Sequence, residues 1–498
     1  MIRNLILSVA LSLIHPLSLE AAAEARPGSP NVIIILVDDL GYADTGCYGA
    51  MPQHVLTPNI DRLAREGRRF TDAHSPSSVC TPSRYSMLTG EYGFRNRQAK
   101  NILPGNAPLS IKPGTLTLPA LFQSRGYITG FIGKWHLGLG HTNGIDWNGE
   151  IKPGPLELGF SSAFYMPSTG DRVPTVLIRN HRIENLDHQD PIQVSYQKKV
   201  GNEPTGLENP NMATILLGAK GHDGTITHGV SRIGWMSGGK SALWIDEELM
   251  DRLTSESVRF IEENRSSPFF LYFATHGIHE PRVPARRFVG SSGAGVYGDQ
   301  IVELDASIGR VLKALDDHNL TTNTLVLVSS DNGGAPVDLG AYRYGERANL
   351  HGHIPNGPLR GGKYTTWEGG TRVPLIIRWP KQISSGSVSD ALISLTDLMA
   401  SFAHLLGVTL PENSALDSVD VLDALLGKSS KGRQELVEHK YGDSCALRID
   451  NWKWIDGQLY DLSKDISEQH DIASQQPERA RAMAERLKVI RSSVKTKP

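Results

Sequence analysis

The sequence predicts an α/β protein in which helices sandwich a mostly parallel sheet, followed by a smaller C-terminal α+β subdomain. Three observations predict this fold. Short apolar runs rich in β-branched residues recur along the chain, helix-like segments separate them, and the pattern changes after about residue 430 to short strands and a final helix. The 498 residues, 39% hydrophobic and 21% charged, suit a large folded protein of two or three domains.

The N-terminal residues 1–25 have the pattern of a signal peptide. Arg3 supplies the positive charge, residues 5–14 the apolar stretch, and residues 21–25 the small side chains typical of a cleavage site. His15-Pro16 interrupts an apolar run that is too short to cross a bilayer, which disfavours a membrane anchor. We therefore expect an exported protein, periplasmic or secreted, without a membrane partner.

The strands and helices of the main domain can be placed in order. We expect buried strands at 32–37, 127–132, 269–274 and 325–328. Between them, Thr57-Pro58 begins a helix that Gly67 ends, and apolar residues recur at helical spacing over 299–315. Residues 395–406 read as the last large helix of this domain.

The domain limits follow from changes in composition. Residues 26–430 should form the main domain and residues 431–498 the small subdomain, with short strands near 447–454 and a helix over 478–490. The segment 180–240 is rich in Gly, Asn and His and shows little periodicity. It is expected to be an insertion of loops and hairpins near the mouth of the site.

Charge and cysteine content limit the function classes. A formal net charge of −2 gives no indication of nucleic acid as a partner. Three cysteines, Cys47, Cys80 and Cys445, leave one over if two pair. A disulfide between Cys47 and Cys445 stays open at this point.

Chemically active residues follow each predicted strand. Asp38-Asp39 follows the first, Lys134 and His136 the second, His279 the third, and Asp331-Asn332 the fourth. The carboxyl ends of parallel strands meet at one edge of a sheet, where such folds place their ligands. These side chains should therefore converge on one site.

The acidic pairs indicate a metal. Asp38, Asp39, Asp331 and Asn332 offer only oxygen ligands, which suit calcium or magnesium better than zinc. A single Asp after a strand is more often a cap or turn residue. Two adjacent pairs at one sheet edge would repel each other unless a cation lay between them, so we favour the metal.

Cys80 precedes Thr81-Pro82, a helix start, and so should lie at a helix N-terminus, where anions are favoured. Arg84 lies one turn later on the same side. A buried structural cysteine and a thiolate nucleophile are the alternatives.

Residues 80–84, Cys-Thr-Pro-Ser-Arg, match the Cys-x-Pro-x-Arg signature of the type I, formylglycine-dependent sulfatases. The chain resembles this family, and within it the arylsulfatase A-like group, from about residue 30 to 473. The resemblance implies an alkaline phosphatase-like fold. Further matching blocks are 38–42, 85–90, 133–138, 330–333, 359–363 and 368–370.

The resemblance also implies a mechanism. A maturation enzyme converts Cys80 to formylglycine, whose hydrate attacks sulfur, and His136 later takes a proton from its second hydroxyl so that sulfate leaves. His279 protonates the leaving alcohol, and Asp331 also accepts the proton of the nucleophile. One Ca²⁺ is bound by Asp38, Asp39, Cys80 as formylglycine, Asp331 and Asn332. The implied catalytic residues are Cys80, Arg84, Lys134, His136, His279 and Lys363, of which Lys134, His279 and Lys363 also bind substrate.

The expected substrate is a sulfated carbohydrate, with aryl sulfates also accepted. The candidates for reading the sugar are Trp235, Gly238-Gly239-Lys240, His222 and Asp171-Arg172. A structural role is the alternative for each of them, and His222 leans towards it. Two rivals remain: a phosphatase or phosphodiesterase of the same superfamily, and a non-catalytic glycan-binding relative. The cysteine at position 80 disfavours the first, and the presence of every candidate catalytic group disfavours the second.

Overall fold

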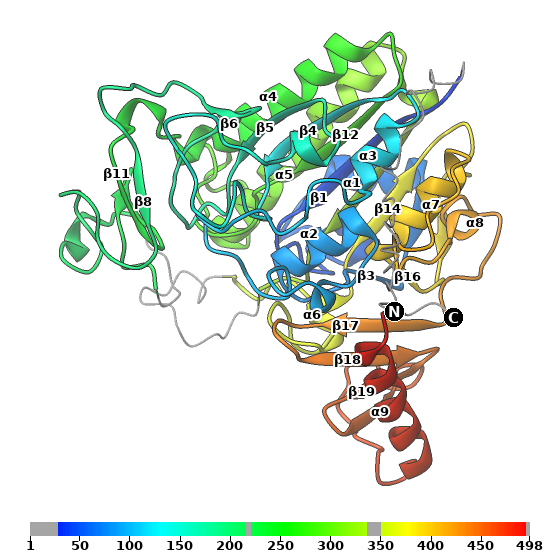
Figure 1. Cartoon of the computed structure of the whole chain (residues 1–498). Helices are drawn as coiled ribbons and strands as arrows, with labels where there is room; N and C mark the ends of the chain where they lie inside the picture. The colour runs from blue at the N-terminus through cyan, green and yellow to red at the C-terminus, as the bar shows by residue number, and fades with distance from the viewer. Residues whose placement is uncertain (1–27, 216–220, 336–349, 495–498) are drawn as a thin grey trace, which may run out of the picture.

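A ten-stranded sheet forms the centre of the molecule (Figure 1). The computed structural model describes residues 28–215, 221–335 and 350–494, so the predicted signal peptide lies outside the described residues. The strand order is β15-β2-β14-β13-β1-β12-β4-β5-β6-β7. This confirms the α/β class and the parallel centre of the sheet.

The four predicted strands form the middle of this sheet. β1 (Asn31–Val37) lies between β12 (Phe269–Ala274) and β13 (Thr324–Ser330), and β4 (Ile128–Lys134) pairs with β12, all in parallel. Alternate residues of β1 enter two different hydrophobic clusters, one on each face of the sheet. A strand buried on both faces needs a continuous apolar run, which is why sequence patterns located these strands.

The outer strands make the sheet mixed. One side carries β14 (Leu375–Arg378), β2 (Arg68–Phe70) and β15 (Ser387–Ser389), and the other β5 (Ser162–Met166), β6 (Ile178–Arg179) and β7 (Arg182–Ile183). β14 runs antiparallel to both β13 and β2, and the β5–β6 and β6–β7 pairs are also antiparallel. A separate pair joins β3 (Ala73–His74) to β16 (Ile393–Ser394).

Helices cover both faces. α1 (Pro58–Glu66), α4 (Asp246–Asn264) and α5 (Gly295–Asp317) pack on one face. α2 (Cys80–Thr89), α3 (Leu118–Gln123), α7 (Leu398–Leu405) and α8 (Leu422–Leu425) pack on the other. The predicted helix after Thr57 is confirmed, but Thr57 does not cap it, because its hydroxyl binds Gly46 N and Asp61 instead.

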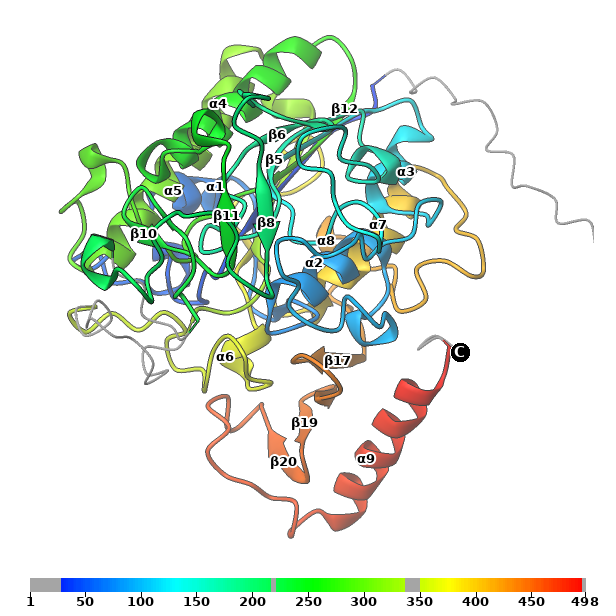
Figure 2. The same ribbon diagram turned by 60° about the vertical axis from the view of Figure 1, so that its left-hand side comes forward.

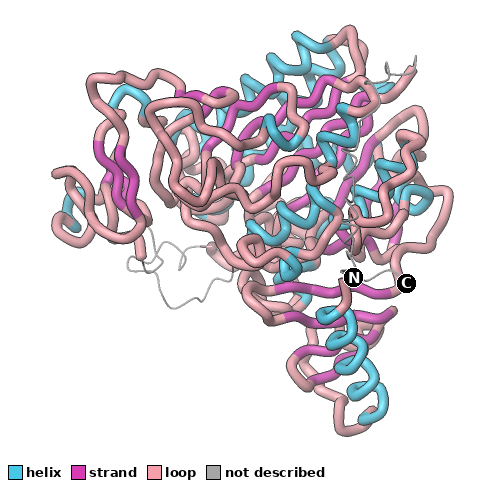
Figure 3. Tube along the Cα trace, viewed as in Figure 1, coloured by secondary structure: helices cyan, strands magenta, loops and turns pink. Residues whose placement is uncertain are grey.

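The segment between β7 and α4 consists mainly of loops and hairpins, as predicted (Figures 2 and 3). β8 (Gln193–Ser195) pairs with β11 (Trp235–Ser237), and β9 (Ile226–Thr227) pairs with β10 (Val230–Ser231). These strands extend from the side of the main domain that carries β5 and β6 (Figure 1).

The C-terminal subdomain is an antiparallel sheet with one helix, which confirms its α+β class. It contains β17 (Glu435–His439), β18 (Cys445–Ile449), β19 (Trp452–Ile455), β20 (Gln458–Asp461) and α9 (Pro477–Ser492). β17 also contacts the main domain: Ser78 N donates to His439 O at 2.8 Å, and His439 N donates to Pro76 O at 3.1 Å. The subdomain therefore braces the chain just before Cys80.

A buried cluster of charges joins the subdomain to the main domain. The ammonium of Lys453 on β19 lies 2.8 Å from Glu368, 2.6 Å from Glu438 and 3.2 Å from Glu468, and all four side chains are fully buried. Glu468 Oε2 accepts the Glu368 N–H at 2.7 Å, and Arg360 donates to the Glu468 carbonyl at 2.6 Å. The subdomain thus holds residues 360–368, the segment that leads into α6 (Glu368–Thr371), at both ends.

Cys47, Cys80 and Cys445 are all free, so the Cys47–Cys445 disulfide left open by the sequence is not formed. Among the described residues, no helix has both the length and the apolar character needed to cross a membrane.

Candidate active site

The polar residues predicted to converge do so at the carboxyl ends of the central strands. Asp38-Asp39 directly follows β1, and Asp331-Asn332 directly follows β13, the parallel neighbour of β1. The ligand atoms of Asp38, Asp39, Asp331 and Cys80 all lie within 4.8 Å of one another. The sheet therefore builds a compact group of acids around the start of α2.

This group fits a hard cation. Asp38, Asp39, Asp331 and Asn332 are at most 3% exposed. Asn332 Nδ2 donates to Asp39 Oδ1 at 2.8 Å, whereas Asn332 Oδ1 is buried without a hydrogen-bond partner. An orphaned buried oxygen beside three carboxylates is the ligand chemistry that calcium or magnesium requires.

Three cationic side chains pair with the three acids. Lys134 Nζ lies 2.6 Å from Asp38 Oδ2, Lys363 Nζ lies 2.7 Å from Asp39 Oδ2, and Arg84 Nε donates to Asp331 Oδ2 at 2.8 Å. Three positive and three negative charges sum to zero. A bound divalent ion would give these groups a net charge of +2, which favours an anionic ligand such as a sulfate ester.

The acids of the group differ in their electrostatics. Burial, together with the neighbouring Asp331 and Asp39, raises the pKa of Asp38 to about 7. Burial also disfavours the charged form of Asp39, but Lys363 and His279 hold its pKa below the usual range. Like charges at close range raise a carboxyl pKa in this way, and a cation between them would reverse the effect.

Cys80 is the first residue of α2, as predicted, and its Sγ lies 3.5 Å from Asp38 Oδ1. Burial and the nearby Asp331 raise the pKa of its thiol to about 12. The unmodified thiol is therefore protonated at neutral pH, which disfavours the thiolate alternative. Arg84 lies one turn along the same helix and donates to the Lys134 carbonyl at 2.9 Å, which fixes the two cations together.

His136 has the arrangement of a base. Its Nε2 donates to Leu103 O at 2.9 Å, so Nδ1 carries the free lone pair, and this atom is buried without a partner. Burial and the nearby Lys134 hold its pKa well below the usual value for histidine. The ring is therefore neutral, with one nitrogen ready to accept a proton.

His279 is held through its other ring nitrogen, in contrast to His136. Its Nδ1 donates to Glu280 O at 2.7 Å, and its Nε2 faces the acids, 3.9 Å from Asp39 Oδ2. Burial and Lys363 hold its pKa well below the usual value. This residue can exchange a proton at Nε2 on the side where Asp39 and Lys363 meet.

The residues predicted as candidates for sugar recognition separate into two groups in the structure. Asp171 Oδ2 lies 3.1 Å from His222 Nε2, and Asp171 Oδ1 accepts from Arg172 at 2.9 Å. The charge of Asp171 also opposes the lowering of the pKa of His279, so this set lies near that residue. His222, a sugar-reading candidate that leaned towards a structural role, thus belongs to a polar set with Asp171 and Arg172. Lys240 is exposed and Trp235 lies on β11, and no contact between either side chain and the acids is found among the described residues.

Sequence reasoning missed Asp44, a fully buried connector at the rim of the site. Its Oδ2 accepts from Gly41 N at 2.6 Å and from the Tyr297 hydroxyl at 2.7 Å, and its Oδ1 bonds His353 Nε2 at 2.7 Å. Asp44 therefore joins the chain after β1, the start of α5 and the loop that leads to Lys363. Tyr297 and His353 lie more than 250 positions away from Asp44, so no local pattern could have identified these two partners.

Comparisons with known proteins are consistent with this geometry. Residues 30–408 match the family model described as Sulfatase, and residues 362–493 match the model described as N-sulphoglucosamine sulphohydrolase, C-terminal. The chain is 44% identical over 483 residues to the N-acetylgalactosamine-6-O-sulfatase of Bacteroides thetaiotaomicron, with 93% of each protein covered. Arylsulfatase A of Homo sapiens is 33% identical over 434 residues, which cover 87% of this chain and 73% of the relative.

The fold has an equally similar solved counterpart. A structure determined for the metabolism of multiple glycosaminoglycans by Bacteroides thetaiotaomicron superposes with a TM-score of 0.90 at 43% identity. The superposition covers 94% of this chain and 100% of the other.

Proposed function

The chain belongs to the sulfatase family, and from this premise we propose that it removes the 6-O-sulfate from N-acetylgalactosamine residues of a sulfated glycan. The observation that carries the chemistry is Cys80, which starts α2 within 4.8 Å of three buried acids. The sugar and its sulfated position rest on the 44% identity to a relative named for that substrate. Aryl sulfates should also react, because a phenolate leaves more easily than a sugar alkoxide.

We further propose that a maturation enzyme oxidises Cys80 to formylglycine and that one Ca²⁺ is bound by residue 80 with Asp38, Asp39, Asp331 and Asn332. The unpartnered Asn332 Oδ1 and the all-oxygen set of side chains support this ion. The hydrated aldehyde would supply a hydroxyl nucleophile, and the ion would polarise the sulfate group. Export through the signal peptide predicted over residues 1–25, to the periplasm or outside the cell, belongs to the same proposal.

The cationic side chains would bind the sulfate. Lys134 and Lys363 each place an ammonium at an acid of the group, and Arg84 holds its guanidinium against Asp331. Negative charge that develops in the transition state would meet preorganised donors in a site shielded from water. Arg84 is locked by two hydrogen bonds, so we assign it to orientation and the two lysines to contact with sulfate oxygens.

The two histidines would perform the proton transfers. His136 offers Nδ1 as a base, because the Leu103 carbonyl already fixes its proton on Nε2. His279 must carry a proton on Nε2 to protonate the departing oxygen. Its ring is neutral in the free protein, and a bound sulfate anion would raise its pKa towards the value that this role needs.

The polar set at the mouth would recognise the sugar. Asp171, Arg172 and His222 present acceptors and donors that are already fixed by bonds to one another. A site built to hydrogen-bond a hydroxyl discriminates strongly against a sugar in which that hydroxyl is absent or reversed. We therefore assign these three residues to the ring hydroxyls rather than to the sulfate.

Sulfate release from four substrates tests this proposal. The panel contains 6-O-sulfated and 4-O-sulfated N-acetylgalactosamine, 6-O-sulfated N-acetylglucosamine and nitrophenyl sulfate, and the first should give the highest kcat/KM among the sugars. The peptide containing residue 80 should be lighter than the thiol form by about 18 Da, the net change from thiol to the aldehyde that covalent catalysis requires. Full activity with an intact thiol would refute the maturation, and a preference for another sugar would refute the substrate.

A pair of histidine variants tests the recognition set. His222→Gln should lower kcat/KM for the sugar sulfate by roughly ten- to a hundredfold and change nitrophenyl sulfate turnover little. His228→Gln is the matched control, because His228 lies in the same insertion and bonds the Trp244 carbonyl instead of Asp171. Equal losses in the two variants would contradict the assignment of His222.

A further inference from the structure

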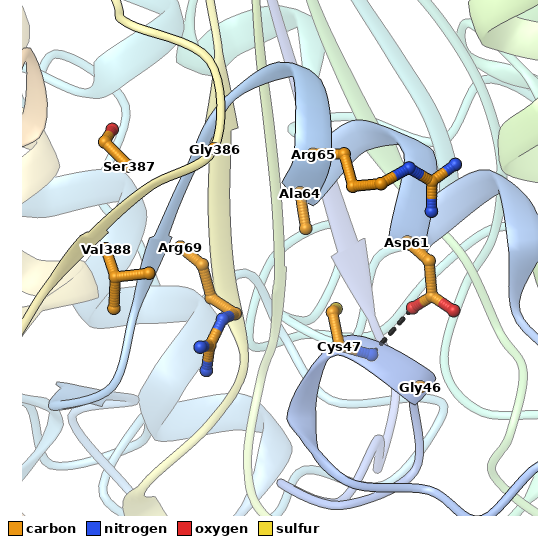
Figure 4. A pocket seen from close by; sticks show the side chains of 9 residues that line it. All are labelled: Gly46, Cys47, Asp61, Ala64, Arg65, Arg69, Gly386, Ser387 and Val388. Atoms are coloured by element: carbon orange, nitrogen blue, oxygen red, sulfur yellow. Dashed lines mark hydrogen bonds between the residues drawn. The ribbon is translucent and has the colours of Figure 1, made fainter.

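A surface pocket of about 380 Å³ lies at the edge of the sheet (Figure 4). α1, β2, β15 and the 3-10 helix Gly46–Tyr48 form its walls. β2 is three strands away from β1 in the order β1-β13-β14-β2, so roughly 14 Å of sheet separates them. The lining residues include Cys47, Asp61, Arg65, Arg69, Ser387 and Val388.

Two arginines of this pocket have no acidic partner. By contrast, two arginines outside the pocket lining share one acid: Glu66 lies 2.6 Å from Arg62 of α1 and 2.8 Å from Arg378 of β14. Within residues 28–215, 221–335 and 350–494, neither Arg65 nor Arg69 makes an ion pair or a side-chain hydrogen bond. Figure 4 shows Arg69 on the β2 side and Arg65 on the α1 side of Cys47.

The remaining polar groups of the pocket do not neutralise these cations. Asp61 Oδ1 accepts from Cys47 N at 2.7 Å and from the Thr57 hydroxyl at 3.2 Å, which holds the carboxylate at the start of α1, and this group supplies one negative charge to the pocket. Burial raises the pKa of the Cys47 thiol to about 12, which leaves it uncharged. Two guanidinium groups against one carboxylate leave an excess of positive charge.

Arg69 is also held in place. It is half-buried in β2, and its guanidinium lies 5.2 Å from the centre of the Tyr48 ring. Contact with an aromatic face orients the guanidinium plane and leaves its N–H groups free to donate. A guanidinium group that is fixed and partly desolvated presents several N–H donors in a defined geometry. Proteins use such groups to bind planar carboxylates and tetrahedral sulfates.

We propose that this pocket is a second anion-binding site, which holds a sulfate or carboxylate group of an anionic glycan chain while another unit of the chain is in the active site. Arg69 binds the oxyanion, with Val388 and Cys47 as an apolar surface beside it. The exposed side chain of Arg65, whose guanidinium group points away from Arg69 in Figure 4, turns to the bound anion from the α1 side. That the anion is carried by a glycan rests on the proposed function. The existence of an anion site does not.

Arginine labelling with phenylglyoxal, read by peptide mass spectrometry on the full-length protein, tests the site without any turnover. The probes are sodium sulfate and a chondroitin 6-sulfate tetrasaccharide, each compared with sodium chloride at the same ionic strength. Labelling of Arg65 and Arg69 should slow about tenfold at saturation, as expected for a charge-assisted contact, whereas labelling of Arg62 should not change. Failure of both probes to protect Arg65 and Arg69 would overturn the site.

The two probes identify the source of the anion. Protection by the tetrasaccharide at a lower concentration than by sulfate supports a glycan-borne anion. Protection by sulfate alone overturns the glycan assignment and leaves a site for the free anion. Both results stand even if the protein fails to hydrolyse every substrate of the panel, so a wrong proposed function would not be mistaken for a wrong pocket.

Variants give a second measurement. Arg65→Gln with Arg69→Gln should weaken tetrasaccharide binding at least about tenfold while turnover of the sulfated monosaccharide stays unchanged. Arg62→Gln is the control, since it removes the same charge from the same helix outside the pocket. If the control weakens binding as much as the double variant, general electrostatic attraction explains the result and the proposal is wrong. Unfolding curves of each variant exclude loss of the fold.

Discussion

Lys453→Met would remove the ammonium that three buried glutamates share. Its Nζ lies 2.8 Å from Glu368, 2.6 Å from Glu438 and 3.2 Å from Glu468, and none of these side chains is exposed. Breaking a buried ion pair from one side costs about 3–5 kcal/mol, because the remaining charge has no compensation. We expect a loss of free energy of unfolding at the upper end of this range at pH 8.

The pH dependence of this loss has a definite sign. Burial raises the pKa of Glu468 to about 7 even though Lys453 opposes the shift, so removing Lys453 raises it further. A carboxyl whose pKa is higher in the folded state stabilises the fold below its unfolded pKa and loses this contribution as pH rises through the folded value. The deficit of the variant should therefore be larger at pH 8 than at pH 5.

Urea unfolding followed by tryptophan fluorescence at both pH values measures the effect. Lys464→Met is the matched control, since Lys464 belongs to the same subdomain, is 81% exposed and pairs with Asp461 at 3.0 Å. An exposed pair of this kind is worth about 0–1 kcal/mol. Equal losses in the two variants at pH 8, or a larger loss for Lys453→Met at pH 5, would refute the reasoning.

Three further perturbations have expected outcomes. Chelation should abolish sulfate release, and calcium or magnesium should restore it better than zinc, because the candidate ligands are all oxygens; stronger rescue by zinc would favour the phosphatase-like rival. Gly133→Ala should cost about 3 kcal/mol or more in urea unfolding, because the backbone is left-handed (φ +113°) and the new Cβ would lie 1.8 Å from Ala274 O. Gly114→Ala, at φ +89° with no atom within 4 Å, should cost only the backbone strain, and equal costs would contradict this account. In a burst assay, His136→Ala should release one equivalent of alcohol and stall, whereas His279→Ala should slow sugar sulfates roughly a hundred- to ten-thousandfold and nitrophenyl sulfate much less. The reverse pattern would exchange the two roles.

The sequence predicted the centre of the fold and of the site for one physical reason. Strands buried on both faces must be continuously apolar, and polar residues directly after them must lie at one sheet edge, so Asp38 and Asp331 could be placed together across almost 300 positions. The sheet edge could not be predicted in this way. β2 has the sequence Arg-Arg-Phe and pairs through its backbone, so its side chains do not follow a strand pattern.

Residues that act through distant partners also could not be predicted from the sequence. Local rules treat a lysine such as Lys453 as a surface residue, and only the fold brings it to Glu368, 85 positions away. The sequence also left His222 leaning towards a structural role, because its partner Asp171 lies 51 positions before it. Both cases depend on tertiary contacts between polar side chains, for which the chain carries no periodic signal.

The burial of Cys80 would impose an order of events on its proposed oxidation during synthesis. Its side chain is 2% exposed, and residues 72–90 are all buried in the folded chain. The proposed maturation enzyme would therefore have to reach this cysteine before β17 pairs with the preceding segment. His439 of β17 follows Arg84 by 355 residues, which at typical translation rates gives an interval of about 20 to 70 s. In a nascent chain that folds before this oxidation, the Cys80 thiol would stay buried. Only unfolding would expose the thiol to the enzyme again.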